Sequence, residues 1–405
     1  MGFHHGLSGL NAASKSLDVS GHNIANSNTI GFKKSRAEFN EMVASAMGSG
    51  QCPGSAGAGI GVSVAAVTQQ FSQGVITPTA NGLDMAINGD GFFVVNTPSG
   101  TAYTRNGAFQ LDKNGFLVTA NGDKVQGWAD ANATGAQPMD LQFPTGAGIP
   151  GRQTTGLSIQ AANLPATAPD AISVTPNTPR HTYGTSLQVY DSQGVAIPVE
   201  VYFVKNGSNT WDVYDTLDPA VTTPVGQVTF DGEGKFVSST VTGLNVDPSA
   251  ANPNNPPAPF NVTLDLSGMT QNDRKWSVDK MTQDGYASGE LTGVNVSKDG
   301  TLMASYSNGL TRPEGKVALA RFTNPQGLAP NGNNNWVQTN DSGPVLYGSA
   351  GSGSFGQIKG CALEESNVDL TAELVGMMTA QRSYQANAQT IKTQDQVFST
   401  LVNLR

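Results

Sequence analysis

Both ends of this 405-residue chain carry an apolar repeat of seven residues. Near the C-terminus, the alternating four-and-three spacing selects ten positions, eight of them apolar or aromatic: Leu370, Leu374, Met377, Gln381, Tyr384, Ala388, Ile391, Asp395, Phe398 and Val402. Near the N-terminus, the same spacing selects Phe3, Leu7, Leu10, Ser14, Leu17, Gly21 and Ile24. Such repeats are typical of helices that supercoil against other helices. Helical ends that flank a long Gly-rich body predict a subunit that pairs its termini as a coiled coil and polymerises.

The N-terminal helix is predicted over Phe3–Asn26, and it is about 35 Å long at about 1.5 Å per residue. It contains Gly6, Gly9 and Gly21, each of which costs about 1 kcal/mol relative to Ala in a helix interior. A single helix of this length is marginal in water even when it is made of better helix formers. We therefore expect it to be largely disordered in the free monomer until a partner covers its apolar side chains.

The C-terminal helix is predicted over Asp369–Val402, a length of about 50 Å. Ser366 or Asn367 is expected to cap its start, and the acidic residues around its first turn favour the helix dipole. An ordinary core helix is the alternative. That alternative is weaker, because the N-terminal segment is the one other segment of helical length in the sequence.

The chain between the helices reads as β-structure, with short alternating runs separated by Asn-Gly and Asp-Gly corners. Its last part repeats the pattern of its first part, so the chain is predicted to return and complete the domain that it began. The predicted fold class is α+β and multidomain, with a terminal helical coiled coil and two stacked all-β domains, the outer one inserted in the inner one. The predicted boundaries are 1–27 and 366–405 for the helical coiled coil, 28–69 for a connector with a short helix around Glu38–Ala46, 70–148 and 285–365 for the inner β-domain, and 149–284 for the outer β-domain.

The composition argues against several classes of partner. Charged residues are 13% of the chain, about half the usual quarter, and the net charge of -9 is mild, so we expect neither a nucleic acid nor a membrane as partner. No uninterrupted apolar stretch reaches the roughly 20 residues that cross a bilayer. The N-terminus lacks the pattern of a cleaved signal peptide. Cys52 and Cys361 fit no metal spacing. They are expected to be free thiols, and a disulfide between them is the alternative if their two regions meet.

No motif in the sequence indicates catalysis. Gly146–Gly151 and Gly351–Gly356 match the Gly-x-Gly-x-x-Gly pattern, but neither has the preceding strand and following helix that phosphate binding needs. Both are predicted to be ordinary loops. The four histidines are His4, His5, His22 and His181, and they show no metal-ligand spacing. We expect no catalytic, cofactor-binding or metal-binding residues and no enzyme activity.

The segment Gly21–Lys33, GHNIANSNTIGFK, resembles the N-terminal signature of the bacterial flagellar axial proteins, the family of rod, hook and hook–filament junction proteins. The residues that carry the resemblance are Asn23, Ile24, Ala25, Asn26, Thr29, Gly31, Phe32 and Lys33. The last 40 residues resemble the paired C-terminal helix of the same family. GLDMAINGDGFFVV and YTRNGAFQLDKNGFLV resemble the inner β-domain that its distal rod and hook members share. LQVYDSQGVAIPVEVYFVKNGSNTWDVY resembles the outer domain of hook-type members, which distal rod-type members lack.

The resemblance implies a structural subunit that needs no cofactor. A hook-type member would assemble with copies of itself into a hollow, bendable helical tube that transmits torque from rod to filament. Its further partners would be the distal rod protein, the hook cap and the hook–filament junction protein. It would be extracellular, in the flagellum, after export by the flagellar type III system without a cleaved signal peptide.

Two groups of residues are expected to carry this function. The expected assembly interface is Leu7, Leu10, Leu17, Ile24, Leu370, Leu374, Met377, Tyr384, Ile391 and Phe398. The expected hinge is the family motif, namely Asn23, Asn26, Thr29, Gly31 and Phe32. The asparagines can close the helix by hydrogen-bonding the backbone, and Gly31 allows a tight bend before Phe32 docks. This bend would set the angle of the helix relative to the β-body.

Two other classes remain open. A distal rod-type protein would be of the same family but straight and rigid. A secreted β-rich adhesin or surface-array protein would also be acidic and sparsely charged. The latter should tolerate the loss of its last 40 residues, whereas a polymerising subunit without them should stay monomeric.

Overall fold

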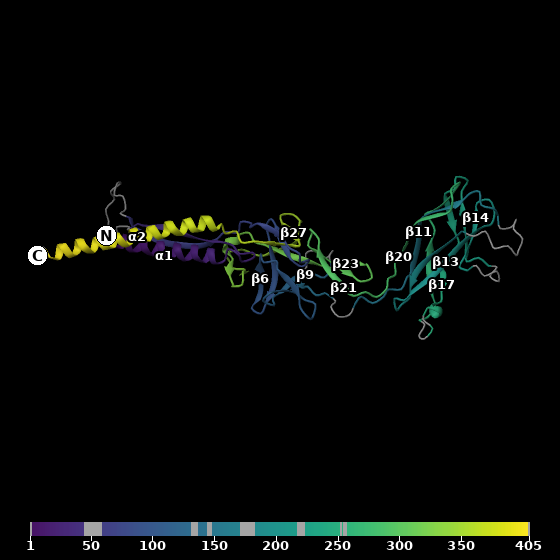
Figure 1. Cartoon of the computed structure of the whole chain (residues 1–405), viewed down its shortest axis with the longest axis horizontal. Coiled ribbons are helices and arrows are strands. Elements are labelled where there is room, and N and C mark those ends of the chain that lie inside the picture. Colours follow the sequence, from purple (N-terminus) through teal and green to yellow (C-terminus); the bar gives the residue numbers. More distant parts are fainter. Residues whose placement is uncertain are drawn as a thin grey trace. The chain divides into compact units, whose positions relative to one another are not determined.

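The computed structural model describes residues 2–43, 59–130, 137–143, 148–170, 183–216, 223–251, 253 and 257–403. The chain divides into two compact units (Figure 1). Met1–Thr145, Gly293–Ser305 and Thr311–Arg405 form the first, and Gly146–Thr292 with Tyr306–Leu310 forms the second. The first unit holds both terminal helices and a β-domain, and the second is built from β-strands. The predicted α+β class, with helices at both ends of a body of several β-sheets, is confirmed.

The two terminal helices are α1 (Gly2–Ala25) and α2 (Leu370–Asn403). They lie side by side within the first unit (Figure 1). They are antiparallel, because Gly6 lies against Ile391 whereas Gly9, one turn further along α1, lies against Asn387, one turn earlier on α2. The apolar repeats at the two ends of the chain thus lie on neighbouring helices.

Asp369 is the N-cap residue of α2. Its Oδ1 accepts hydrogen bonds from the amides of Thr371 at 2.9 Å and Ala372 at 3.2 Å, two donors that the helix itself leaves unpaired. The prediction that Ser366 or Asn367 caps this helix is therefore wrong. The helix begins at Leu370, too late for either side chain to reach its first turn.

The connector contains a two-stranded antiparallel ribbon of β1 (Ser35–Val43) and β2 (Gly59–Gln69). The short helix expected around Glu38–Ala46 is wrong for Glu38–Val43, and residues 44–46 lie outside the described part of the chain. The strand forms because β2 supplies cross-strand partners, with Phe39 opposite Val64. Aromatic and β-branched pairs of this kind stabilise a sheet, and tertiary pairing overrides a weak helical pattern.

The β-domain of the first unit is built around one large sheet with the order β21-β22-β23-β9-β5-β6-β25-β24. Early and late parts of the chain pair directly in it, since β23 pairs with β9 at Val317↔Gly127 and with β5 at Leu319↔Phe93. Two smaller ladders join β4 to β27 and β3 to β28. The strands are β3 (Ile76–Pro78), β4 (Met85–Asn88), β5 (Phe92–Thr97), β6 (Gly100–Thr104), β7 (Phe109–Leu111), β8 (Leu117–Thr119), β9 (Lys124–Trp128), β10 (Met139–Asp140), β21 (Leu291–Val296), β22 (Thr301–Tyr306), β23 (Thr311–Arg321), β24 (Ala329–Pro330), β25 (Asn335–Val337), β26 (Leu346–Ser349), β27 (Gln357–Gly360) and β28 (Ala362–Glu364).

Aromatic rings fill the core of this domain on the side where the chain arrives from β2. Phe92 on β5 makes edge-on contacts with Phe71 at 5.6 Å and with Trp336 at 5.7 Å between ring centroids. Edge-to-face geometry adds to the gain from burial alone. Phe71, which follows the β1–β2 ribbon, is thereby packed against the large sheet.

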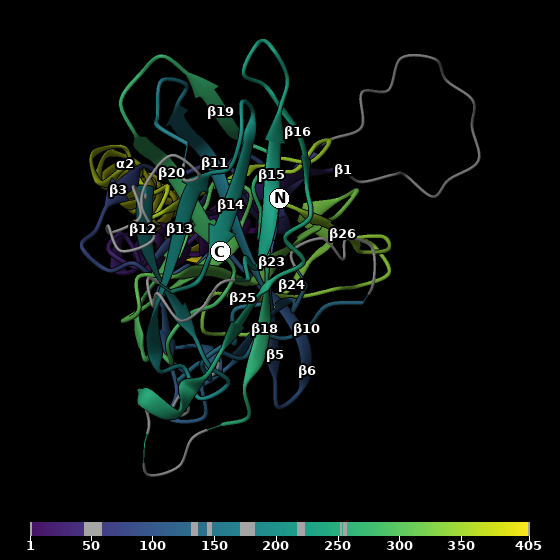
Figure 2. The ribbon, with the colours of Figure 1, turned by 90° about the vertical axis from the view of Figure 1, so that its right-hand side faces the viewer.

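The second unit has two sheets that share one apolar core. One sheet has the order β12-β13-β14-β15-β16, whose strands run side by side in Figure 2. The other has the order β17-β18-β11-β19, with β20 also paired to β11. The fully buried Trp211 lies in the shared core, and its Nε1 donates to Gln271 Oε1 at 3.1 Å. The strands are β11 (Gly156–Pro165), β12 (Tyr183–Tyr190), β13 (Ala196–Lys205), β14 (Thr210–Tyr214), β15 (Gly226–Phe230), β16 (Phe236–Ser239), β17 (Leu244–Val246), β18 (Phe260–Asp265), β19 (Met269–Asn272) and β20 (Ser277–Gln283).

Both units use the same hairpin turn, which has the sequence Asp-x-x-Gly. The aspartate Oδ1 accepts hydrogen bonds from the amides two and four residues later, as Asp112 does from Asn114 at 2.9 Å and Phe116 at 2.7 Å. The glycine takes a positive φ, 82° at Gly115, a conformation that costs other residues energy. The same pattern recurs at Asp191 and Asp231.

Candidate assembly interface

Within one chain, α1 and α2 approach closely through small residues. A Cβ added to Gly6 would lie 2.8 Å from Ile391 Cγ1, and one added to Gly9 would lie 2.8 Å from the side-chain amide of Asn387. Ala380 on α2 is also buried. Gly6 and Gly9, two of the three glycines that weaken α1 as an isolated helix, therefore permit its close contact with α2.

The expected interface residues face two ways. Leu10, Leu17, Ile24, Met377 and Ile391 are half-buried within the chain. The exposed members are Leu7 on α1 and Leu370, Leu374, Tyr384 and Phe398 on α2. Three further apolar side chains of α2 are also exposed, namely Val375, Met378 and Val397. We call these eight exposed side chains the apolar stripe.

The end of α2 extends beyond α1. The helix α2 has 34 residues and α1 has 24, so α2 is about 15 Å longer at about 1.5 Å per residue. Because Gly6 contacts Ile391, the extra turns lie at the C-terminal end of α2, past the start of α1 (Figure 1). The side chains of residues 395–400 are all exposed, including Phe398 at 55%. These turns carry apolar groups that the described part of the chain does not cover.

The segment after α1 is held in place by the side chain of Asn23. Its Nδ2 donates to Ser35 O at 2.8 Å, and its Oδ1 accepts from Ser35 N at 2.9 Å. Asn26 Nδ2 donates to His22 O at 2.9 Å, and Thr29 Oγ1 donates to Asn26 Oδ1 at 3.2 Å. These bonds close the end of the helix, as expected for asparagine near a helix terminus.

We call residues 26–34 the elbow. Within it, Gly31 has a φ of 70°, and a Cβ added there would lie 2.6 Å from Asn106 N. Phe32 is buried and its ring centroid lies 5.6 Å from that of His22. The elbow is therefore packed closely on the β-domain, and the expected hinge residues lie within it or, as Asn23 does, just before it.

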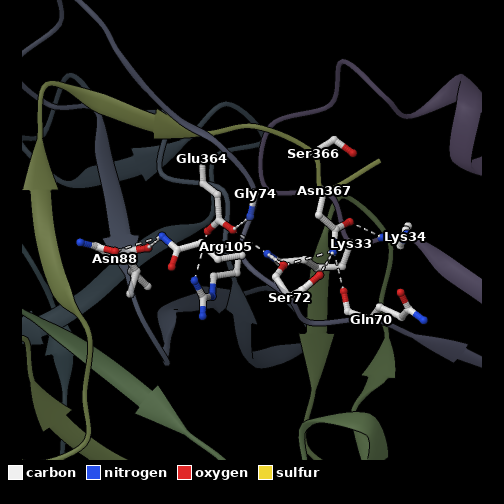
Figure 3. Close-up of polar contacts among 12 residues, drawn as sticks. Lys33, Lys34, Gln70, Ser72, Gly74, Asn88, Arg105, Glu364, Ser366 and Asn367 are labelled. Atoms are coloured by element: carbon white, nitrogen blue, oxygen red, sulfur yellow. Dashed lines mark hydrogen bonds and ion pairs between the residues drawn. The ribbon is translucent and has the colours of Figure 1, made fainter. Parts of the chain in front are cut away.

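A buried carboxylate lies where the elbow meets the β-domain (Figure 3). Glu364 Oε1 accepts hydrogen bonds from Lys33 Nζ at 2.6 Å and from Gly74 N at 2.8 Å, and Oε2 accepts from Arg105 Nη1 at 3.1 Å. The side chains of Lys33 and Glu364 are fully buried and that of Arg105 is 4% exposed. We call Lys33, Arg105 and Glu364 the Glu364 cluster.

The cluster combines two cations with one anion. Burial lowers the pKa of Lys33, and the charge and hydrogen bond of Glu364 oppose this effect. Burial likewise lowers the pKa of Arg105, again opposed by Glu364. Arg105 has two further contacts, a hydrogen bond from Nη2 to Gly89 O at 2.8 Å and the ring of Phe92 at 5.4 Å. Its Nε is buried without a hydrogen-bond partner.

Asn367 makes a second connection beside the Glu364 cluster (Figure 3). Its Oδ1 accepts from Lys34 N at 2.7 Å, and its Nδ2 donates to Gln70 O at 2.8 Å and Ser72 O at 3.1 Å. Gly31 N also donates to the backbone oxygen of Glu364 at 2.8 Å. The elbow, residues 70–74 and residues 364–367 thus form one hydrogen-bonded junction from which both helices leave.

Sequence reasoning missed this junction. It named Lys33 only as part of a motif and treated Glu364 as one of several acids near the start of α2. The local sequence does not distinguish a buried lysine from a solvated one, because a buried lysine needs an acidic partner that only the folded chain brings near. For Lys33 this partner is Glu364. The position of Lys33 directly after Phe32, within the family motif, was the available signal.

The cysteines and the two Gly-x-Gly-x-x-Gly segments lie outside the junction. Cys361 is an exposed free thiol, and Cys52 lies outside the described residues. Gly351–Gly356 forms the turn between β26 and β27, and four residues of Gly146–Gly151 are described, in extended chain. Across the described residues, no group of three His, Cys, Asp or Glu side chains could hold a metal ion. Among the described helices, none is long and apolar enough to cross a membrane.

Four family models match successive parts of the chain. Residues 3–33 match "Flagella basal body rod protein" and residues 86–166 match "Flagellar hook protein FlgE/F/G D1 domain". Residues 159–286 match "Flagellar basal body protein FlaE D2 domain", and residues 360–404 match "Flagellar basal body rod FlgEFG protein C-terminal". The first match includes α1 and most of the elbow, and the last includes Glu364 and α2.

Full-length relatives and a solved structure agree with these matches. The chain is 42% identical to flagellar hook protein FlgE of Escherichia coli K12 over 421 residues, which cover 100% of both chains. It is 32% identical to flagellar hook protein FlgE of Borreliella burgdorferi over 99% of both chains. The crystal structure of Helicobacter pylori flagellar hook protein FlgE2 matches with a TM-score of 0.51 at 16% identity, covering 70% of this chain and 99% of that one, and shows the likeness of fold. The chain belongs to the flagellar hook protein FlgE family.

Proposed function

We propose that this chain is the structural subunit of the bacterial flagellar hook and that it polymerises through α1 and α2 into a hollow, bendable helical tube. The tube would transmit torque from the rod to the filament. The full-length relatives named flagellar hook protein support this role. The family is structural, and we assign no catalytic residue.

The apolar stripe is the observation that carries the proposal. Leu374 is 50% exposed and Phe398 is 55% exposed, on a helix whose last turns have no partner among the described residues. Seven of the eight side chains lie on α2, and a concentration of exposed apolar groups on one element marks an interaction site. A helix with an apolar repeat of seven is complementary to another helix of the same kind. The occupant that the repeat favours is a second copy of the α1–α2 pair.

The asymmetry of the two helices favours an open polymer over a closed pair. A stripe that continues past the start of α1 would meet a copy displaced along the helix axis. Repeated displacement of this kind is a heterologous contact, which extends into a helical filament when it does not close. Ser14, Gly21, Gln381 and Asp395 interrupt the repeat, and polar positions in such a seam fix register.

Bending requires contacts that slide, and we assign these to the β-units. Only 13% of the residues are charged, so few strong ion pairs would lock neighbouring copies together. The helical layer would be the stiff element and the polar β-surfaces the adjustable one. The proposed further partners are the distal rod protein, the hook cap and the hook–filament junction protein. We propose export through the flagellar type III system, and neither nucleic-acid binding nor membrane insertion.

Deletion of residues 366–405 tests the proposal. The full chain, seeded with sonicated polymer, should form tubes by electron microscopy and pellet on ultracentrifugation. The deleted chain should keep the β-signal in circular dichroism and stay in the supernatant as a monomer. A deleted chain that still forms tubes would contradict the proposed role of α2 and would favour a β-mediated surface array.

A further inference from the structure

Three distant parts of the chain donate hydrogen bonds to the carboxylate of Glu364, which lies at the end of β28. The donors are Lys33 in the elbow, Gly74 after the β1–β2 ribbon and Arg105 after β6. Lys33 and Glu364 are 331 positions apart in the sequence. Their bond can therefore form only when segments from both ends of the chain are present.

The helices leave the junction on either side of this bond. The helix α1 ends at Ala25, shortly before Lys33, and α2 begins at Leu370, shortly after Glu364. The relative direction of the two helices at their base is thus set by how residues 31–34 lie against residues 364–367. Hydrogen bonds join these two stretches, among them Gly31 N to Glu364 O at 2.8 Å and Lys34 N to Asn367 Oδ1 at 2.7 Å.

Loss of the carboxylate would act mainly on the elbow. Breaking a buried ion pair by removing one partner is strongly destabilising, because the other charge stays buried without compensation. Arg105 would keep its contacts with Gly89 O and the Phe92 ring, whereas Lys33 Nζ would keep its hydrogen bond to Ser72 O at 2.7 Å and lose its charged partner. Lys33 lies near a chain end and can reach water by moving the elbow, which leaves the sheets intact.

We propose that Glu364 is the positioning residue that couples the two ends of the chain: it holds the elbow against the segment leading into α2, so that α1 and α2 are aligned to pair only when both ends are in place. The coupling itself is a property of the monomer. Its consequence for polymerisation rests on the proposed function.

The test compares Glu364→Gln and Lys33→Met with the unmodified chain by hydrogen exchange of full-length monomer. Both variants should raise exchange in residues 26–34 at least tenfold and leave β5 and β9 unchanged. Lys33→Met keeps the Arg105–Glu364 pair and the Gly74 hydrogen bond, so it decides the question if Glu364→Gln does not fold. Protection of the elbow at the unmodified level in Lys33→Met would overturn the proposal.

Two further variants separate charge from shape. Glu233→Gln makes the same chemical change at a side chain that is 78% exposed, and it should alter nothing. The double variant Lys33→Met/Glu364→Gln removes the uncompensated ammonium together with the carboxylate. Its elbow should exchange no faster than that of Glu364→Gln alone, since interacting residues are non-additive. Additive effects of the two substitutions would overturn the proposed coupling.

Seeded polymerisation gives the functional readout. Glu364→Gln should elongate at least tenfold more slowly than the unmodified chain, although its apolar stripe is unchanged. Elongation at the unmodified rate with an unprotected elbow would show that the coupling does not align the helices. Failure of the unmodified chain to polymerise would contradict the proposed function and leave the exchange result to decide the coupling.

Discussion

Lys33 Nζ lies 2.6 Å from Glu364 Oε1, and both side chains are fully buried although they are 331 positions apart. A buried ion pair is weak evidence for stability, because the desolvation of two charges offsets their attraction. In the proposed coupling, this pair contributes specificity of arrangement, since an unpaired charge in the same place costs several kcal/mol. The pair lies where the elbow, the segment after the ribbon and the segment before α2 meet. In the proposed coupling, the angle of both helices therefore depends on a few contacts at this junction.

Gly31→Ala should disturb the elbow. The residue has a φ of 70°, and an added Cβ would lie 2.6 Å from Asn106 N, which is backbone and cannot swing aside. We expect a loss of about 1–3 kcal/mol of local stability, seen as faster hydrogen exchange in residues 26–34.

Gly21→Ala is the matched control, because no heavy atom lies within 4 Å of the added Cβ. It lies in the interior of α1, where Ala is better than Gly by about 1 kcal/mol. Exchange in α1 should slow or stay the same. If Gly31→Ala were as well tolerated as Gly21→Ala, the elbow would be looser than the structure indicates.

Leu374→Lys and Phe398→Lys should separate assembly from folding. Both side chains are at least half exposed in the single chain, and surface substitutions usually change stability by about 0.5 kcal/mol or less. The urea midpoint of each variant should therefore match that of the unmodified chain. Seeded elongation should be lost, because a lysine in an apolar seam must be desolvated when a second copy covers it.

Val237→Lys is the control for this pair, since Val237 is 60% exposed but lies on β16 of the second unit. It should fold and should still form tubes. Equal loss of assembly in all three variants would indicate that the β-units, and not the apolar stripe, form the decisive contact.

Asp284→Asn should reduce the sensitivity of the second unit to acid. Burial tends to raise the pKa of Asp284, but hydrogen bonds from the Thr155 side chain and from the amides of Gly156 and Thr155 hold it below its ordinary value. A carboxylate with a lowered pKa in the folded state adds stability that is complete above its unfolded pKa of about 3.9 and is lost as the pH falls through the folded pKa.

Urea midpoints measured from pH 7 to pH 2 check this expectation. The unmodified chain should be the more stable one at pH 7, and its advantage over Asp284→Asn should shrink below about pH 4. The side chain is 37% exposed, so solvent screening keeps the effect modest. An advantage that stays constant down to pH 2 would show that the stabilising groups do not depend on the charge of Asp284.

The elements that the sequence predicted correctly are those whose signal lies in neighbouring residues. The helices α1 and α2 were predictable because the whole seven-residue repeat of each helix lies within one continuous segment of the sequence. The strand β1 was not, because its stability comes from pairs with a different strand, such as Phe39 with Val64 on β2. The incorrect prediction that Asn367 caps α2 has the same cause. Its side chain hydrogen-bonds the backbone of Lys34 and Gln70, which are far away in sequence, and Asp369 caps the helix instead.

Gly6→Leu should weaken the pairing of α1 with α2. A Cβ at Gly6 would lie 2.8 Å from Ile391 Cγ1, and the larger side chain would force the helix axes apart. Overpacking of this kind costs about 1–3 kcal/mol, so the critical concentration for seeded assembly should rise about tenfold, the change that corresponds to about 1.4 kcal/mol. Gly376→Ala on α2 is the matched control, because no atom lies within 4 Å of the added Cβ and the helix gains propensity. Its critical concentration should stay the same or fall. A Gly6→Leu chain that assembles at the unmodified concentration would mean that the helices pair by another face in the tube, and the small-residue contact seen in the single chain would then belong to the monomer alone.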